Sequence, residues 1–167
     1  SILDPSPDAV VLWLALSRLG ATSAPINTAF KGEFLRHQIA DCGARLIVAD
    51  AAYVPNIATI ADQLPELGKL YHRGDAPALA GLDCAPFDTL RSGSEEEIDA
   101  GAEPGDIAVL LYTSGTTGPS KGCMVPQKYI CAMGWQSNRY IGIGHEDVYW
   151  TPCPLFHLGA AGGMIGT

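Results

Sequence analysis

The chain has 167 residues, enough for one domain with a hydrophobic core or for a piece of a larger domain. Hydrophobic residues make up 47% and charged residues only 17%, which excludes an intrinsically disordered segment. The net charge of −8, with only 10 basic residues, argues against a general binder of nucleic acid or of anionic membranes.

The cysteine and hydropathy patterns predict a soluble, cytoplasmic protein with reduced thiols. The 5 cysteines show no C-x-x-C spacing and are odd in number, which disfavours a zinc site and a disulfide framework. No signal peptide is recognisable, and the apolar residues 10–16 are far fewer than the ~20 needed to span a bilayer. We therefore expect no integral membrane segment.

The first helix is marked by strong local signals. Ser6 followed by Pro7 and Asp8 is typical of a helix start, because serine caps the backbone and the carboxylate favours the positive end of the helix dipole. The pattern predicts a helix from Pro7 to about Leu19, with Gly20 as its stop. Since this helix is apolar nearly all round, we expect it to be buried on most sides.

The following segments alternate between extended and helical patterns. The predicted elements are a short strand over residues 21–26, a helix over residues 32–42, a buried strand over residues 46–49 and a helical stretch over residues 55–64. The apolar face of the second helix is expected to consist of Phe34, Leu35, Ile39 and Cys42. Alternation at this spacing is typical of an α/β fold with a largely parallel sheet.

Residues 73–105 interrupt this alternation. They contain several glycines and prolines and three consecutive glutamates, so we expect an irregular surface connection with the glutamates in solvent. The elements predicted beyond it are a buried strand over residues 107–111, a short strand over residues 122–125, a helix over residues 126–140 and a strand over residues 147–151. We therefore divide the domain into a helix/strand portion, residues 1–105, and a second portion, residues 106–167. Both chain ends cut through expected elements, which predicts that the start and the remainder of the domain are missing.

The most informative segment is residues 112–122, which read YTSGTTGPSKG after a buried strand. Glycines let backbone amides approach phosphate oxygens, hydroxyls donate hydrogen bonds and lysine supplies a positive charge, so the segment predicts a nucleotide-phosphate loop. It is not a Walker A sequence, because Ser120 precedes Lys121 and Gly122 follows it. The alternative, a plain surface turn, explains neither the density of serine and threonine nor the lysine.

Residues 112–122 resemble the AMP-binding signature of the adenylate-forming superfamily, which includes acyl-CoA synthetases, firefly luciferase and the adenylation domains of nonribosomal peptide synthetases. The family pattern usually has proline directly before the lysine, where this chain has Ser120. Residues 15–28 are similar to the family's helix-then-G-A-x-x-x-P-x-N passage, and residues 154–157 to its P-L-F-H motif. Residues 26–41 are similar, more narrowly, to carnitine- or crotonobetaine-CoA ligases.

This resemblance implies part of the large N-terminal α/β domain of an adenylate-forming enzyme, with layered, mostly parallel sheets and flanking helices. It implies a fragment of an ATP-dependent acid:CoA ligase (acyl-CoA synthetase) that activates a carboxylic acid as an acyl-adenylate and transfers it to CoA, as in fatty acid metabolism. The expected cofactors are ATP, Mg²⁺ and CoA, and the partner is a small carboxylic acid. An adenylation domain that loads a carrier protein and a noncatalytic nucleotide-binding module are the alternatives. The fragment alone is expected to be inactive.

The resemblance also assigns site residues. The set expected to bind the phosphates of the cofactor is Thr113, Ser114, Gly115, Thr116, Thr117, Gly118 and Lys121. His157 matches the family histidine beside the acyl pocket and is the expected catalytic residue. No residue is assigned to a metal, and the residues that bind adenine, ribose and metal, with the catalytic lysine, are expected beyond Thr167.

The other histidines and the tryptophans are expected to be structural. His37, His72 and His145 lie outside every motif, and Trp135 and Trp150 are expected in the core or in a pocket wall. A truncated domain exposes apolar faces, which favours self-association into a homo-oligomer. The identity of the acid is not predicted.

Overall fold

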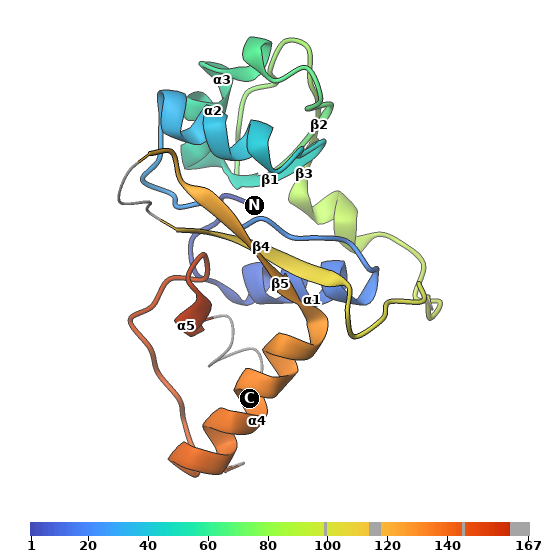
Figure 1. Ribbon diagram of the computed structural model, residues 1–167. Coiled ribbons are helices and arrows are strands. Elements are labelled where there is room, and N and C mark those ends of the chain that lie inside the picture. Colours follow the sequence, from blue (N-terminus) through green and yellow to red (C-terminus); the bar gives the residue numbers. More distant parts are fainter. Residues whose placement is uncertain (99, 114–117, 145, 161–167) are drawn as a thin grey trace. The chain divides into compact units, whose positions relative to one another are not determined.

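The computed structural model describes residues 1–98, 100–113, 118–144 and 146–160 (Figure 1). The chain divides into two compact units, each assembled from three separate segments. Unit 1 consists of Ser1–Asp4, Ala24–Glu97 and Tyr112–Gly122, and unit 2 consists of Pro5–Ser23, Ile98–Leu111 and Cys123–Thr167. The two ends of the predicted phosphate loop therefore belong to unit 1.

Unit 1 contains a three-stranded parallel sheet. Its strands are β1 (Leu46–Asp50), β2 (Lys69–Arg73) and β3 (Asp83–Pro86), in the spatial order β1-β2-β3. Both pairings are parallel, and Ile2 adds a parallel bridge to Ala49 of β1. With the helices described next, this sheet confirms the predicted α/β fold with a parallel sheet.

The helices of unit 1 pack with the sheet around one apolar core. They are α2 (Gly32–Asp41) and α3 (Val54–Ala58), with the short 3-10 helices η1 (Ala51–Tyr53) and η2 (Ala61–Gln63). The buried core residues are Ile2, Ile26, Leu35, Ile39, Ile47, Ala49, Val54, Ile57, Ile60, Leu64, Leu67 and Leu70. Full burial of one large aliphatic side chain stabilises a fold by about 1.5–3 kcal/mol, so this core fixes α2 firmly to the sheet.

Unit 2 has a separate core. Its elements are α1 (Pro7–Arg18), α4 (Gln127–Ile141), the three-residue α5 (Leu158–Ala160) and most of the two-stranded sheet formed by β4 (Ile107–Thr113) and β5 (Lys121–Pro126). The connection between β4 and β5 is too short for a parallel crossover, so the two strands are antiparallel. The buried core residues are Trp13, Val109, Leu111, Val125 and Ile130, with Leu158 packed against them.

Local sequence signals set the ends of the helices. The side chain of Ser6 accepts a 3.3 Å hydrogen bond from the N–H of Ala9, and Pro7 is the first residue of α1. Helix α4 ends at Gly142, whose φ of 77° is the left-handed conformation that glycine adopts at low cost. The predicted limits of α1, α2 and α4 are confirmed to within one residue at each end.

The predicted burial of α1 is wrong. Trp13 is its buried residue, whereas Val11 (63% exposed) and Leu14 face solvent. Trp13 packs with Val109 of β4 in the core of unit 2, so one face of the helix is covered by its own unit.

The predicted apolar face of α2 needs a similar correction. Its buried residues are Leu35, Gln38 and Ile39, so Phe34 (72% exposed) lies outside the stripe and contacts Phe30 instead. Helical spacing of i, i+3 and i+4 selects the buried face, and here that face includes a glutamine.

Two predicted strands do not form. Residues 21–26 contribute only one parallel bridge, between Ser23 and Val109. Residues 147–151 are irregular and pair with no strand among the described residues. Both segments have suitable residues, but a strand also needs a neighbouring strand that offers free backbone groups.

The predictions for the middle of the chain are partly correct. Residues 73–105 were expected to be irregular, yet they contain β3 and the 3-10 helix η3 (Phe87–Arg91). The three glutamates at residues 95–97 are exposed, as predicted. The helical stretch predicted over residues 55–64 is divided into α3 and η2.

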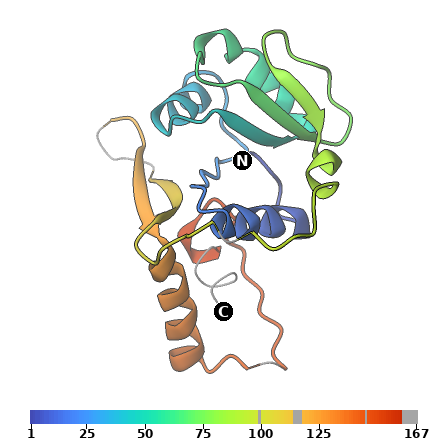
Figure 2. The same cartoon turned by 90° about the vertical axis from the view of Figure 1, so that its right-hand side faces the viewer.

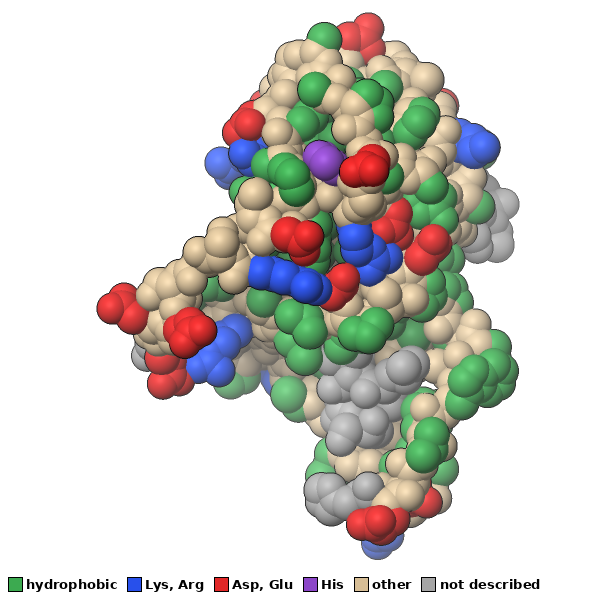
Figure 3. All heavy atoms as spheres, turned by 180° about the vertical axis from the view of Figure 1, so that it is seen from behind, with side chains coloured by type: hydrophobic (Ala, Val, Ile, Leu, Met, Phe, Trp, Pro, Cys, Tyr) green, Lys and Arg blue, Asp and Glu red, His purple; other side chains and the backbone are tan. Residues whose placement is uncertain are grey.

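The surface carries mixed charges and several exposed aromatic side chains. Trp135 and Trp150 (78% exposed) are not buried, so the first of their two predicted places, the core, is wrong, and the second, a pocket wall, stays a prediction. On the face shown in Figure 3, basic side chains lie beside acidic ones, and the described part of that face has no continuous basic area. Within the described residues, no helix has the length and apolar character needed to cross a membrane.

Candidate functional site

The predicted phosphate loop connects β4 to β5. Ser114, Gly115, Thr116 and Thr117 lie outside the described residues. Thr113 is the last residue of β4 and Lys121 the first residue of β5, so the strand pair brings the two ends of the loop together. Burial along β4 decreases from Leu111, which is buried, through Tyr112 to Thr113, which is exposed. The strand thus leads the chain from the core of unit 2 to the surface.

The described members of the predicted phosphate-binding set are accessible to a ligand. Thr113, Gly118 and Lys121 are all exposed. No carboxylate of the described residues forms an ion pair with the ammonium group of Lys121. A threonine hydroxyl, an exposed glycine backbone and a lysine without an acidic partner form a donor set that suits polyphosphate oxygens.

The ring of Tyr112 connects the loop to α2. Its hydroxyl donates a 2.7 Å hydrogen bond to Oδ2 of Asp41, the last residue of that helix. Burial and this hydrogen bond both raise the pKa of Tyr112, so the phenol keeps its proton and remains a donor. A Cβ atom on Gly122 would lie 3.2 Å from Cζ of the ring, so glycine at this position makes room for the tyrosine.

Ser120, the residue directly before the loop lysine, makes two hydrogen bonds to the same helix. Nε2 of His37 donates to the backbone oxygen of Ser120 over 2.9 Å, since a carbonyl oxygen can only accept. Nε2 of Gln38 donates to Oγ of Ser120 over 3.3 Å. Figures 1 and 2 show the start of β5 beside α2 from two directions.

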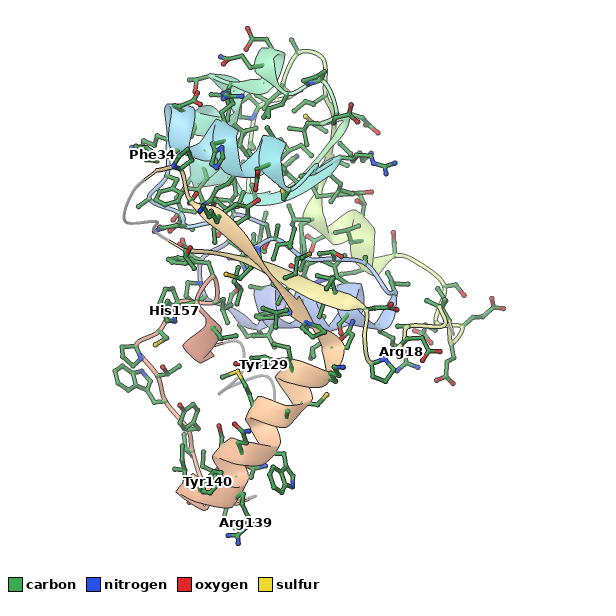
Figure 4. All side chains as sticks on the ribbon, in the orientation of Figure 1. Arg18, Phe34, Tyr129, Arg139, Tyr140 and His157 are labelled. Carbon is green, nitrogen blue, oxygen red and sulfur yellow. The ribbon has the colours of Figure 1, made fainter. Side chains whose placement is uncertain are left out.

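His157 lies in unit 2, directly before α5, and Figure 4 labels its side chain. The imidazole is exposed, and its Nδ1 accepts a 3.2 Å hydrogen bond from the N–H of Gly159. The neutral ring therefore carries its proton on Nε2, which is left to face a ligand. A Cβ atom on Gly159 would lie 3.2 Å from Sγ of Cys153, so a larger residue would press on that side chain, whereas its distance of 3.5 Å from Nδ1 of His157 is an ordinary contact.

The described residues contain no group of three or more histidine, cysteine, aspartate or glutamate side chains that could hold a metal ion.

Sequence reasoning missed the contribution of α2 to this site. His37 was expected to be structural, and Gln38 and Asp41 were not considered. One available signal was the helical spacing itself, which places Gln38 on the buried face between Leu35 and Ile39. A glutamine at such a position needs a hydrogen-bond partner.

The sequence matches the family described as "AMP-binding enzyme" over residues 2–167. The chain belongs to the AMP-binding enzyme family. This membership confirms the resemblance to the adenylate-forming superfamily that residues 112–122 indicated.

Curated relatives in the AMP-binding family include several kinds of protein. The very long-chain fatty acid transport protein of Cochliobolus heterostrophus is 31% identical over 155 residues, which cover 93% of this chain and 23% of the relative. Tyrocidine synthase 3 of Brevibacillus parabrevis is 32% identical over 143 residues, covering 85% of this chain and 2% of the relative. The crotonobetaine/carnitine–CoA ligase of Salmonella agona is 29% identical over 160 residues, which cover 93% of this chain and 31% of the relative.

Solved structures of AMP-binding enzymes share the fold. The anthranilate CoA ligase AuaEII in complex with anthranoyl-AMP gives a TM-score of 0.89 at 26% identity, covering 99% of this chain and 32% of that one. The N-terminal domain of FACL13 from Mycobacterium tuberculosis gives a TM-score of 0.82 at 25% identity, covering 99% of this chain and 40% of that one. The ATP-bound MatB of Rhodopseudomonas palustris gives a TM-score of 0.77 at 28% identity, covering 99% of this chain and 32% of that one. The α/β fold therefore matches the N-terminal domain of acyl-CoA ligases, and the chain spans less than half the length of these relatives.

Proposed function

We propose that this chain is part of an ATP-dependent acid:CoA ligase in which residues 112–122 hold the β- and γ-phosphates of ATP. The observation that carries this proposal is the exposed ammonium group of Lys121, which has no carboxylate partner among the described residues. It lies at the start of β5, at the end of a loop rich in glycine and hydroxyl groups, in a chain of the AMP-binding enzyme family.

The proposed reaction has two steps. A carboxylate oxygen of the acid attacks the α-phosphorus of ATP, the bond from that phosphorus to the bridging oxygen breaks, and pyrophosphate leaves. The thiol of CoA then attacks the acyl carbon, AMP leaves with the bonding electron pair, and the thiol proton is released. A bound Mg²⁺ ion supplies further neutralisation of the phosphate charge.

The loop residues act in the first step by stabilising the charge that develops on pyrophosphate. Lys121 supplies the positive charge, and the hydroxyls of Thr113, Ser114, Thr116 and Thr117 supply hydrogen bonds, with backbone N–H groups at Gly115 and Gly118. A preorganised donor that tightens in the transition state contributes about 3 kcal/mol. The proposal therefore expects the loop to act more on the rate of adenylation than on the binding of the acid.

His157 is proposed to contact the carboxylate side of the acid. Its Nε2–H is the group available for that contact, because Nδ1 is occupied by the N–H of Gly159. The identity of the acid, and with it the depth of the pocket, is not assigned.

A second candidate function is the adenylation of an amino or other acid for transfer to a carrier protein. The similarity to tyrocidine synthase 3 favours this candidate as a general class. The two functions share the first step and differ in the thiol that accepts the acyl group.

The experiment uses the full-length protein that contains this chain. ATP–pyrophosphate exchange is measured with a panel of aliphatic and aromatic carboxylic acids, for the natural sequence and for Lys121→Ala. We expect the variant to lose about 100-fold in exchange rate, because a donor to the transition state is removed. The matched control is Lys128→Ala, an exposed lysine on α4, which should retain full activity.

Unchanged exchange in Lys121→Ala would overturn the proposed function. Formation of a CoA thioester separates the ligase from the carrier-protein candidate, and binding of MgATP without exchange for any acid would favour a noncatalytic module. The isolated 167-residue chain is expected to give no exchange, and exchange above background would contradict that expectation.

A further inference from the structure

Three hydrogen bonds from the C-terminal half of α2 connect this helix to the ends of the phosphate loop. His37 and Gln38 bind Ser120, and Asp41 binds Tyr112. His37 and Asp41 are four residues apart, so they lie one above the other on the same side of the helix. We refer to these three hydrogen bonds as the loop-end contacts. All five residues belong to unit 1.

The contacts at Ser120 act at the end of the loop that carries the lysine. The backbone oxygen of Ser120 accepts from His37 over 2.9 Å, and its hydroxyl accepts from Gln38 over 3.3 Å. Ser120 is covalently bonded to Lys121, the first residue of β5. Hydrogen bonds that hold the backbone of Ser120 therefore restrict the direction in which the side chain of Lys121 points.

The contact at Tyr112 acts at the opposite end of the loop. The phenol donates to Asp41 over 2.7 Å, and Tyr112 directly precedes Thr113, the first predicted phosphate ligand. The ring also covers Gly122, the residue after Lys121. One aromatic side chain thus contacts α2 and both strands that lead into the loop.

Helix α2 is fixed well enough to serve as a support. Leu35 and Ile39 are each 1% exposed and belong to the core of unit 1. Gln38 is 2% exposed, and its Oε1 has no hydrogen-bond partner among the described residues, whereas its Nε2 reaches Ser120. Burying half of an amide without a partner is costly, so the position is better explained by the contact to the loop than by packing alone.

We propose that His37 and Asp41 are positioning residues of the phosphate site, which hold the two ends of the loop in the geometry that receives the triphosphate. This inference rests on the proposed function of the loop. Its physical basis is preorganisation: donor groups such as those of Thr113 and Lys121 lose less conformational entropy on binding phosphate when the neighbouring backbone is already held in place. Neither residue touches the nucleotide in this proposal.

The test uses the full-length protein and measures the binding of MgATP by calorimetry together with ATP–pyrophosphate exchange. His37→Ala removes the contact at Ser120, and Tyr112→Phe removes the contact at Asp41 while keeping the ring over Gly122. Each variant is expected to weaken MgATP binding by about tenfold and to lower the exchange rate by a similar factor, without changing the KM of the acid.

Further variants test whether the effect on MgATP binding comes from these particular hydrogen bonds. Asp41→Asn keeps an acceptor oxygen for Tyr112 and should restore binding to within about threefold of the natural protein, whereas Asp41→Ala should not. His72→Ala is the matched control, because the ring of His72 also hydrogen-bonds a backbone oxygen, that of Gly74 at 2.7 Å, in the same unit. It should leave MgATP binding unchanged.

The outcomes separate this inference from the proposed function. If Lys121→Ala abolishes exchange but His37→Ala and Tyr112→Phe bind MgATP normally, the positioning role is wrong and the function of the loop stands. If Lys121→Ala has no effect, the function itself fails. Should His37→Ala unfold, Tyr112→Phe still tests the contact at Asp41, since a half-buried ring that loses only its hydroxyl preserves the packing.

Discussion

The ring of Tyr112 lies so close to Gly122 that a Cβ atom at that glycine would be 3.2 Å from Cζ of the ring. Such a contact is shorter than ordinary van der Waals separation, so any side chain at residue 122 would displace the tyrosine. The displacement would also move the phenol away from Asp41, which accepts its hydrogen bond. Glycine at residue 122 therefore makes room for the ring of Tyr112, whether or not the loop binds phosphate.

We expect Gly122→Ala to destabilise the fold by about 1–3 kcal/mol and to weaken MgATP binding, because the methyl group overpacks the strand pair and moves the ring. Chemical denaturation and calorimetry measure the two effects. Gly68→Ala is the control, since a Cβ atom there would meet no atom within 4 Å. Equal stability of the two variants would contradict the proposed packing of Tyr112 on Gly122.

The pair formed by Gln38 and Ser120 predicts a coupled effect. Ser120→Ala leaves the buried amide of Gln38 without its partner, and we expect a loss of about 1–3 kcal/mol in the free energy of unfolding. Replacing Gln38 with leucine in the same protein should recover part of that loss, because no buried amide then remains. If the changes in unfolding free energy of the two single variants simply add in the double variant, the two side chains do not interact. As a control, Ser94→Ala, at an exposed serine, should change the free energy of unfolding little.

The ion pair between Asp50 and Arg73 connects the carboxyl ends of β1 and β2. Nε and Nη2 of the guanidinium donate to Oδ1 and Oδ2 at 2.6 and 2.9 Å, and the carboxylate also accepts from the N–H of Asp4 at 2.7 Å. Because this carboxylate is mostly buried, Asp50→Ala is expected to destabilise unit 1 by about 3 kcal/mol. The control is Asp62→Ala, which removes an exposed carboxylate and should show no comparable change in thermal unfolding. A similar loss of stability in Asp50→Ala and Asp62→Ala would refute a special role for the Asp50–Arg73 pair.

Burial raises the pKa of the Cys42 thiol, whose Sγ also approaches the carbonyl oxygen of Ile39 at 3.4 Å. The folded protein therefore holds this proton more tightly than the unfolded chain. Above the ordinary thiol pKa of 9.0 the unfolded state binds fewer protons, so stability falls as the pH rises. We expect Cys42 to react with iodoacetamide more slowly than the exposed Cys123 and Cys131 between about pH 7.5 and 9, as mass spectrometry of the modified peptides will report. Equal rates would contradict burial of Cys42.

The helices could be predicted because their signals are local. Ser6, Pro7 and Gly20 mark the two ends of α1 within the sequence itself, and Gly43 does the same after α2. These residues act through the backbone of their own neighbours, so no distant part of the chain is needed to interpret them.

Strand β3 could not be predicted in the same way. Its residues, Asp83 to Pro86, include no β-branched or large aromatic side chain, and proline is unfavourable in a sheet interior. The strand forms because the free edge of β2 offers parallel backbone partners, and that edge is a property of the folded chain. The converse holds for residues 147–151, which have strand-forming side chains but pair with no strand among the described residues.

The candidate site was predictable only where it forms a continuous motif. The loop at residues 112–122 is recognisable from its composition, and its resemblance to a family assigned the individual residues. His37 and Gln38 are separated from Ser120 by 83 and 82 residues. The spacing of α2 indicates that Gln38 needs a hydrogen-bond partner, but the local sequence does not identify Ser120 as that partner. Trp150 shows the opposite error, since the core was one of its two expected places and the side chain is exposed.

The interleaved segments of the two units affect the order in which the protein folds during synthesis. The sheet and α2 of unit 1 are complete in the growing chain once Glu97 has been added, but the last segment of that unit, Tyr112–Gly122, emerges later. Domains tend to fold as units while the chain is still being made, so unit 1 must wait for this segment. Until it arrives, the partners of His37 and Asp41 do not exist and the amide of Gln38 has no serine to bind. The end of unit 1 that is proposed to bind the nucleotide is therefore the last part of it to be completed on the ribosome.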